Sequence, residues 1–516
     1  MVEADVDIVV IGSGIGGLCC SALLAQYGFE VVVCESHSIP GGAAHGFERQ
    51  GFRFDSGPSL YSGLSYPSAN PLRQVLDALD ETVPCLTYDT WGCLLPEGRF
   101  DTSVGAEQFC EVLHALRGEA AVQEWRQLQR FMEPLKDAAI ALPTAAFRLD
   151  WRAPQILHRY IPTLLSHLPN VARITGAFGP LMDKVVQDPF IRNWLDMLCF
   201  LLSGLPAHST SAAEVAFMFA DWYRPEVQLD YPVGGSAGLV AALVRGLEKH
   251  GGQLRLNAHV EQVVLKEGRA IAVQLRNGQR IHARRAIISN ASVWDTLKLL
   301  PADQLPQRFL KQRQAIPPCA SFMHLHLGID ATGLPADLPC HFIWVGDWAQ
   351  GIDAPQNVVL ISIPSVLDPS LAPPGKHVIH AYTPGNEPFE LWEGLDRHSD
   401  AYMQQKEARS AVMWQALEQV IPGVRSRCDV TLTGTPLTHA RYLRRHRGSY
   451  GPAIPAGRGM FPGARTPIPG LWCCGDSTFP GIGLPAVAAS SFITANTLAS
   501  PQQHQLLLEK LASPCG

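Results

Sequence analysis

The clearest hydrophobic pattern lies near the amino end of the chain. Residues 6–11 form a short apolar run whose β-branched content is typical of a strand buried on both faces. The run leads directly into a glycine-rich turn, after which residues 18–27 predict a helix ending before Gly28. Residues 30–34 predict a second buried strand, and Glu35 stands at its end. This order of strand, glycines, helix, strand and acid predicts a dinucleotide-binding unit.

The glycines of the turn have separate physical roles. Gly12 permits the tight turn, Gly14 lets the backbone approach a pyrophosphate, and Gly17 lets the helix and the strand pack closely. The pyrophosphate would meet free N–H groups and the positive end of the helix dipole. The cofactor contacts predicted from this turn are Gly12, Ser13, Gly14, Ile15, Gly16 and Gly17.

The residues after the second strand favour FAD over NAD. Glu35 can accept hydrogen bonds from a ribose, and Gly41 and Gly42 follow it after five residues, a spacing typical of flavoproteins. Aromatic and polar residues alternate over 51–55 before a Gly-Pro turn, which we interpret as a strand leading to the flavin ring; an ordinary hairpin is the alternative. The contacts predicted from this region are Glu35, Gly41, Gly42, Gly57, Pro58 and Ser59.

A second fingerprint lies near the carboxyl end. Residues 471–474 predict a buried strand that ends in Gly475 and Asp476, a carboxylate suited to the ribityl chain. Pro485 suits the first turn of a helix over 486–498, and the positive end of that helix would stabilise negative charge on a reduced flavin. A plain βα unit is the alternative. The contacts predicted here are Gly475, Asp476, Gly483 and Leu484.

A third segment connects the two fingerprints. Residues 239–250 predict an amphipathic helix after a glycine-rich turn, and Asn277-Gly278 is a strong hairpin signal. Strands are predicted over residues 253–256, 259–266, 270–275, 280–283 and 286–289. The arrangement resembles the β-meander of flavoproteins, which implies that the backbone of Val260 contacts the adenine.

The length of 516 residues exceeds one ordinary core, so we predict two domains. The fold class is α/β: a Rossmann-like FAD-binding domain with a doubly wound sheet and a β-meander excursion, plus a discontinuous α+β substrate domain with a helical lid. The FAD-binding domain is predicted over 1–80, 228–295 and 431–500, the substrate domain over 81–227 and 296–430, and a C-terminal tail over 501–516. Residues 142–174 predict a lid over an apolar tunnel that touches a membrane; an ordinary amphipathic core helix is the alternative.

The amino-acid composition limits which partners and which cellular compartment we expect. Lys plus Arg number 41 and Asp plus Glu number 47, so the net charge is −6 and nucleic acid is not an expected partner. The 13 cysteines form no C-x-x-C pair, which predicts buried thiols, no disulfides, no metal site and a reducing compartment. The first residues lack the pattern of a secretory signal, so we expect a protein that is not secreted. No apolar run approaches the roughly 20 residues of a membrane-spanning helix.

A basic cluster precedes a Gly-Ser-Tyr-Gly-Pro turn. It comprises His439, Arg441, Arg444, Arg445, His446 and Arg447. Contact with phosphate or anionic lipid is one interpretation, and a solvated loop is the other. The sequence shows no Ser/His/Asp triad, paired catalytic carboxylates or metal-ligand spacing, so the catalytic side chains stay unknown and no metal is predicted.

Several segments together resemble the phytoene desaturase and carotenoid isomerase family of flavoproteins over nearly the whole chain. They are IVVIGSGIGGL, E-x5-GG, FDSGPS, YPVGG, GTPLTHARYLRRHRGSYGP and CCGDSTFPGIGLPAVAAS. The last two resemble the prolycopene isomerase branch. The resemblance implies an FAD-dependent isomerase of cis double bonds in a polyene such as prolycopene. It also implies a peripheral protein on the cytoplasmic or stromal face of a plastid or photosynthetic-bacterial membrane.

Other functions remain open on the same fold. Gly234, Gly235 and Gly238 have the wrong spacing for a second nucleotide fingerprint, so any net redox reaction needs an external electron donor or acceptor. A carotenoid desaturase or saturase is the enzymatic alternative, and a flavin amine oxidase shares the fold. A non-catalytic prenyl-binding protein, similar to the guanine-nucleotide dissociation inhibitors, is the alternative of another class. The intact Glu35 and Asp476 argue against it.

Overall fold

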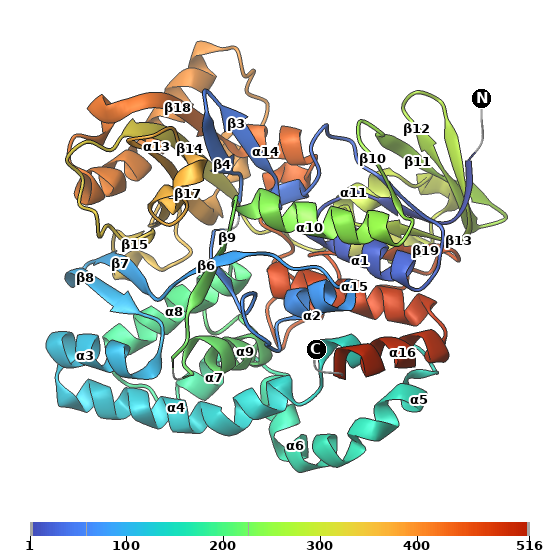
Figure 1. Cartoon of the computed structure of the whole chain (residues 1–516), viewed down its shortest axis with the longest axis horizontal. Coiled ribbons are helices and arrows are strands. Elements are labelled where there is room, and N and C mark those ends of the chain that lie inside the picture. The colour runs from blue at the N-terminus through green and yellow to red at the C-terminus, as the bar shows by residue number, and fades with distance from the viewer. Residues whose placement is uncertain (1–3, 58, 225, 513–516) are drawn as a thin grey trace.

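The first of two large sheets carries the glycine-rich segments (Figure 1). The computed structural model describes residues 4–57, 59–224 and 226–512. Strand order in this sheet is β10-β2-β1-β13-β12-β11, with β19 paired to β13. The parallel strands are β1 (Ala4–Ile11), β2 (Val31–Cys34), β10 (Gln253–Arg255), β13 (Arg280–Ser289) and β19 (Leu471–Cys473). The antiparallel meander is β11 (Val260–Lys266) and β12 (Arg269–Leu275). The predicted fold class is confirmed.

Three helices pack side by side against this sheet. They are α1 (Ile15–Gln26), α10 (Ser236–Lys249) and α15 (Leu484–Leu498). Helix α1 begins at Ile15, three residues before the predicted start, because the glycines of the motif already adopt helical geometry. A Cβ on Gly17 would collide with the carbonyl oxygen of Gly12, so this early start requires glycine.

The meander contains one difference from the sequence pattern. Two strands were expected on either side of Arg284 and Arg285, whereas β13 runs through both residues without interruption. Arg284 lies at the sheet surface and pairs with Asp7 at 3.2 Å and with Glu30 at 2.5 Å. These charges interrupt the apolar pattern, and the register between β1 and β13 shifts here, between the pair of Val6 with Ala283 and the pair of Ile8 with Ala286, but β13 continues.

The second large sheet has the order β18-β14-β17-β16-β15-β7-β8. Its strands are β7 (Thr90–Leu95), β8 (Gly98–Ser103), β14 (Ser321–Asp330), β15 (His341–Val345), β16 (Val358–Ser362), β17 (Lys376–Glu387) and β18 (Cys428–Gly434). Parallel pairing of β7 with β15 joins the two segments that the sequence assigned to the substrate domain. Helix α13 (Asp400–Val420) packs against this sheet over a separate apolar core.

A helical layer lies beside the second sheet (Figure 1). It comprises α3 (Ala106–Arg117), α4 (Glu119–Ile140), α5 (Ala153–Leu157), α6 (Ile161–Ile174), α7 (Gly179–Met182), α8 (Pro189–Ser203) and α9 (Ala212–Trp222). Asp188 and Ser211 cap α8 and α9, each accepting a bond from a backbone N–H in the first helical turn.

Smaller elements complete the chain. The hairpin β3 (Gly46–Arg49) and β4 (Phe52–Asp55) and the short sheet of β5 (Tyr61–Ser62), β9 (Leu229–Pro232) and β6 (Cys85–Tyr88) connect the two large sheets. Other helices are α2 (Pro71–Ala78), α11 (Val293–Lys298), α12 (Gln307–Gln314) and α14 (Pro436–Leu443). Residues 501–512, expected as a tail, form α16 (Pro501–Ala512), which buries His504, Leu507 and Leu508.

The cysteines of the described ranges are free, and most are buried. Among the residues that the structure describes, no helix combines the length and apolar character that crossing a bilayer requires.

Candidate cofactor and ligand cavity

One cavity of about 890 Å³ brings the predicted segments together. The predicted residues that line it are Gly12, Gly14, Ile15, Gly16, Glu35, Gly41, Gly42, Gly57, Ser59, Val260, Gly475, Asp476, Gly483 and Leu484. Ser13 and Gly17 do not line it and support the turn from behind. Pro58 lies outside the described residues. Segments from both ends of the chain therefore form one continuous wall.

Backbone atoms of different segments pack directly against one another in this wall. A Cβ on Gly16 would lie 2.8 Å from the Cα of Gly475, and a Cβ on Gly42 would lie 2.9 Å from the Cα of Gly14. A Cβ on Gly57 would collide with the carbonyl oxygen of Ala43. The start of α1 lines the cavity without a side-chain cap, so its first N–H groups are available to an anion. This cradle fits an extended ligand with a pyrophosphate.

Glu35 ties β2 to the glycine turn. Its Oε2 accepts hydrogen bonds from the backbone N–H of Ser13 at 2.8 Å and from the Ser13 hydroxyl at 2.7 Å. Its Oε1 accepts a bond from the backbone N–H of His37 at 2.8 Å. The carboxylate lines the cavity as well, so a bond from a ribose to Glu35 stays a prediction.

Asp476 has a partner that sequence reasoning missed. Its Oδ2 lies 2.5 Å from Nη2 of Arg445, and both side chains are largely buried. Arg445 also donates from Nη2 to the carbonyl oxygen of Tyr450 at 2.8 Å. The pair therefore fixes the turn after the basic cluster against the second fingerprint, and a ribityl contact of Asp476 stays a prediction.

The rest of the basic cluster separates into individual contacts. Arg447 pairs with Glu390 at 2.7 Å, and the backbone N–H of His446 donates to Asp295 at 2.7 Å. Arg444 is exposed and lines the edge of the cavity beside His259. The cluster is thus partly structural, and Arg444 is its member best placed for a phosphate.

Asn290 is a site residue that sequence reasoning also missed. It follows β13 and lines the cavity. A Cβ on Gly14 would lie 2.8 Å from its Nδ2, and its Oδ1 lies against Gly16 and Gly475. Its position after a parallel strand, where ligands bind in such sheets, is the signal that could have identified it.

Beyond the glycine wall, the cavity becomes apolar. Its side chains here include Leu198, Leu201 and Leu202 near the end of α8, Phe217 and Met218 of α9, and Phe322 of β14. Asp221 is a polar exception whose carboxylate accepts a bond from the Tyr66 hydroxyl at 2.7 Å. This half suits a long hydrocarbon ligand.

Histidines cover another part of the wall. His324 and His326 lie on one face of β14 because side chains alternate along a strand, and His380 of β17 lies opposite His326 in the register. The His326 and His380 rings stack with centroids 4.3 Å apart. Nδ1 of His439 donates to the carbonyl oxygen of Gly448 at 2.8 Å, which leaves Nε2 with the lone pair. His324 and His439 line the cavity.

These imidazoles are neutral at pH 7. Burial lowers the pKa of His326 to about 4 and that of His439 to about 3. The pKa values of His324 and His380 are also well below the ordinary range, because burial disfavours the charged form and neighbouring histidines add repulsion. The wall therefore presents polar rings without net charge.

The ligand atoms of His324, His326 and His380 lie within 4.8 Å of one another, which raises the question of a metal. Nδ1 of His324 and Nε2 of His380 are 3.0 Å apart in rings inclined by only 17° with centroids 5.2 Å apart, so the two nitrogens face each other head-on. An ion between them would need about 2.0–2.1 Å to each nitrogen. The arrangement is a hydrogen bond and does not fit a metal. Within the described ranges, the outer nitrogens, Nε2 of His324 and Nδ1 of His380, have no hydrogen-bond partner.

Comparison with known proteins gives one family and a consistent set of relatives. The family described as flavin containing amine oxidoreductase matches residues 15–499. Prolycopene isomerase 2, chloroplastic, of an Oncidium hybrid cultivar is 34% identical over 96% of this chain and 84% of its own. All-trans-retinol 13,14-reductase of Danio rerio is 27% identical over 92% of this chain and 83% of its own. Phytoene desaturase (lycopene-forming) of Pseudescherichia vulneris is 27% identical over 96% of this chain and 99% of its own.

Solved structures share the fold. An oxidoreductase from Methanosarcina mazei has a TM-score of 0.64 at 20% identity and covers 94% of this chain and 98% of its own. A putrescine oxidase bound to putrescine has a TM-score of 0.62 at 16% identity, with coverages of 96% and 99%. At these identities the likeness concerns the fold alone.

Proposed function

The chain belongs to the flavin containing amine oxidoreductase family, in its branch of prolycopene isomerases and phytoene desaturases, and from that premise we propose that it is an FAD-dependent isomerase acting on cis double bonds of a polyene such as prolycopene. The observation that carries the proposal is the single cavity, in which a glycine cradle opens onto an apolar half. A dinucleotide and a hydrocarbon chain would then share one cavity. We assign the cofactor contacts to the predicted residues that line the cradle.

FAD is the form of flavin that this cavity supports. Flavin mononucleotide would leave the βαβ unit of β1, α1 and β2 without a ligand, whereas FAD extends from that unit to the second fingerprint. We also propose that the first sheet with its helices forms the FAD-binding domain and that the second sheet with α3–α9 forms the substrate domain.

The division of chemical work follows from the residues present. The bound flavin would supply reversible electron donation, which lowers the order of a polyene double bond so that it can rotate. The start of α15 lines the cavity at Leu484 and Pro485, and its dipole favours a negative charge there by about 0.3–1 kcal/mol, or up to ~2 when partly buried. The leucines and Phe217 exclude water, and the neutral histidines add no positive charge near the polyene.

The test compares substrates and flavin states. Purified holoprotein, with flavin either oxidised or pre-reduced under anaerobic conditions, is incubated with poly-cis and all-trans carotenes, and the products are resolved by chromatography and mass. Conversion of the poly-cis substrate to a product of equal mass with reduced flavin supports the proposal. A product two hydrogens lighter with oxidised flavin and an added acceptor indicates a desaturase, and one two hydrogens heavier indicates a saturase.

Net redox chemistry is the second candidate, because the family branch includes a desaturase and a reductase at 27% identity. Either reaction would require an external electron donor or acceptor. Failure to bind flavin at all would favour the non-catalytic prenyl-binding alternative. The chloroplastic relatives support a plastid as the place of action. We propose, from the resemblance to the family, that the protein is peripheral to a plastid or photosynthetic-bacterial membrane.

A further inference from the structure

Large apolar side chains are exposed together between residues 149 and 168. Leu149 is 53% exposed, Trp151 78%, Ile161 50%, Leu165 62% and Leu168 61%. We call these five residues the arm surface. Such a concentration within 20 consecutive positions differs from the single exposed hydrophobics that any surface carries.

The helical part of the arm surface is one face of α6. Ile161, Leu165 and Leu168 follow the i, i+4, i+7 spacing of a single helix face. Helix α6 contacts α4 and α9, so that face points away from the protein. In Figure 1, α5 and α6 form an outer edge of the molecule. The apolar face is therefore not covered by any other described element.

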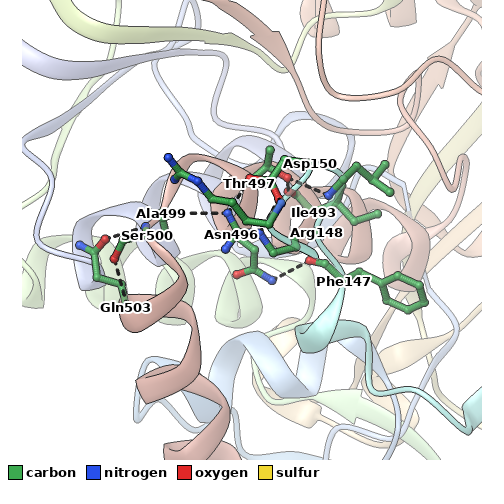
Figure 2. Close-up of polar contacts among 11 residues, drawn as sticks. Phe147, Arg148, Asp150, Ile493, Asn496, Thr497, Ala499, Ser500 and Gln503 are labelled. Atoms are coloured by element: carbon green, nitrogen blue, oxygen red, sulfur yellow. Dashed lines mark hydrogen bonds and ion pairs between the residues drawn. The ribbon is translucent and has the colours of Figure 1, made fainter. Parts of the chain in front are cut away.

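The remaining two residues, Leu149 and Trp151, lie next to an anchored stretch of chain, in which Arg148 and Asp150 form polar contacts beside the end of α15 (Figure 2). Arg148 is 2% exposed, and its Nε and Nη2 donate to Asp150 at 2.8 and 2.7 Å. Nη2 also donates to the carbonyl oxygen of Ala499 at 3.2 Å, and the backbone N–H of Leu149 donates to Thr497 at 3.1 Å. Because Arg148 and Asp150 are fixed against α15, the intervening Leu149 and the following Trp151 project into solvent.

The charge of this segment differs from that of the chain. Residues 141–174 contain four arginines and one aspartate, which gives 4 − 1 = +3 in a chain of net charge −6. The single acid, Asp150, is already paired with Arg148. Arg152 and Arg159 flank the exposed apolar side chains, and Asp150, which also lies near Arg152, is the one carboxylate of the segment. Apolar side chains bordered by arginines match the boundary between acyl chains and anionic headgroups.

We propose that the arm surface docks this protein on an anionic lipid bilayer, with α6 lying in the plane of the interface. The choice of lipid over a protein partner rests on the charge and on the proposed function, because a polyene hydrocarbon resides in the bilayer. Helix α9 contacts α6 and lines the cavity through Phe217 and Met218, so it connects the docked face to the apolar half of the cavity. Docking would place the substrate pathway next to the membrane.

The experiment is flotation of the holoprotein with vesicles of phosphatidylcholine alone or of phosphatidylcholine with phosphatidylglycerol. The variant carries Trp151→Ser, Leu165→Asn and Leu168→Asn, and the control carries Met460→Ser and Leu391→Ser, which alter residues that are 80% and 44% exposed elsewhere. We expect the first variant to bind anionic vesicles at least tenfold more weakly and the control to bind like the wild type. Arg152→Gln with Arg159→Gln should lower only the preference for anionic vesicles.

Each other outcome overturns the proposal. If the variant and the wild type bind vesicles equally, the arm surface is not the docking site. If the wild type binds neither type of vesicle, the protein does not dock on a bilayer. If the wild type forms dimers in the absence of lipid and the variant does not, the arm surface is instead a contact between two copies of the chain. Unchanged flavin content and melting temperature establish that the variant is folded. Isomerisation measured in detergent solution is independent of docking, so a failure of either proposal is recognised separately.

Discussion

The glycine wall and the histidine wall of the cavity are built by different parts of the polypeptide. Glycines 14, 16, 42 and 475 bring backbone against backbone, and the side chain of Asn290 packs against three of them. His324 and His439 instead project rings into the cavity from β14 and α14, and His380 of β17 supports His324 through a hydrogen bond. The first wall depends on small residues at fixed spacing, whereas the second depends on the register of a sheet.

This difference predicts different responses to substitution. Backbone atoms cannot rotate away from an added atom, so the glycine wall should tolerate almost no residue larger than glycine. Side chains can repack, so substitutions in the histidine wall should have graded effects on stability. These effects should also depend on the protonation of the histidines.

The largest effect is expected at Gly17, which supports the glycine wall from behind. Gly17→Ala places a Cβ against the carbonyl oxygen of Gly12, whereas the control Gly463→Ala adds a Cβ with no neighbour within 4 Å. Overpacking usually costs about 1–3 kcal/mol and more where the backbone must move, so we expect about 3 kcal/mol or more and loss of flavin. Flavin absorbance and thermal melting check this. A yellow Gly17→Ala protein that melts with the control would contradict the backbone account.

The pH dependence of stability should come next. The pKa of His439 is about 3 in the folded protein, below its unfolded value of about 6.5, so the folded state binds fewer protons. Its contribution is complete above pH 6.5 and falls as the pH drops from 6.5 toward 3, by about 2 kcal/mol at pH 5. Urea unfolding between pH 5 and 8 measures it. His439→Gln, whose amide can still donate to Gly448, should make the profile shallower by this amount, and the part due to the other buried histidines should remain; an unchanged slope would mean that His439 titrates normally.

A smaller effect is expected where the two walls join. Asp476→Ala leaves Arg445 without its carboxylate partner in a largely buried position, which should cost about 1–2 kcal/mol and weaken flavin binding. Fluorescence titration of the apoprotein with FAD gives the affinity. The double variant Asp476→Ala with Arg445→Met should recover part of the stability but not the affinity. Full affinity in Asp476→Ala would remove Asp476 from the cofactor contacts.

The smallest effect concerns the head-on histidine pair. His324→Phe leaves Nε2 of His380 without its partner, and we expect a loss of about 1 kcal/mol, because an unpaired buried nitrogen is unfavourable. Replacing both His324 and His380 by Phe removes both polar groups, so the double variant should lose less than the sum of the single variants. A double-mutant cycle by urea unfolding measures this coupling. Strict additivity would mean that the bond contributes nothing.

The same contrast explains what could be predicted from the sequence. The glycine wall and the parallel sheet followed from local motifs, since spacing alone fixes where Gly12, Glu35 and Gly475 must lie. The histidine wall did not, because His324 and His380 meet only through the pairing of β14 with β17. Asn290 and the Arg445 partner of Asp476 likewise depend on distant segments. The sequence identified residues 142–174 as amphipathic, but the outward direction of Trp151 follows from bonds to α15.

The most direct measurement is the ratio of product to flavin under anaerobic conditions. The holoprotein is photoreduced, mixed with a large excess of poly-cis carotene, and followed by flavin absorbance while product is quantified. The account predicts many product molecules per flavin, each of unchanged mass, with the absorbance of the reduced flavin retained throughout. One product per flavin, formed as the flavin becomes oxidised, would contradict a redox-neutral isomerase.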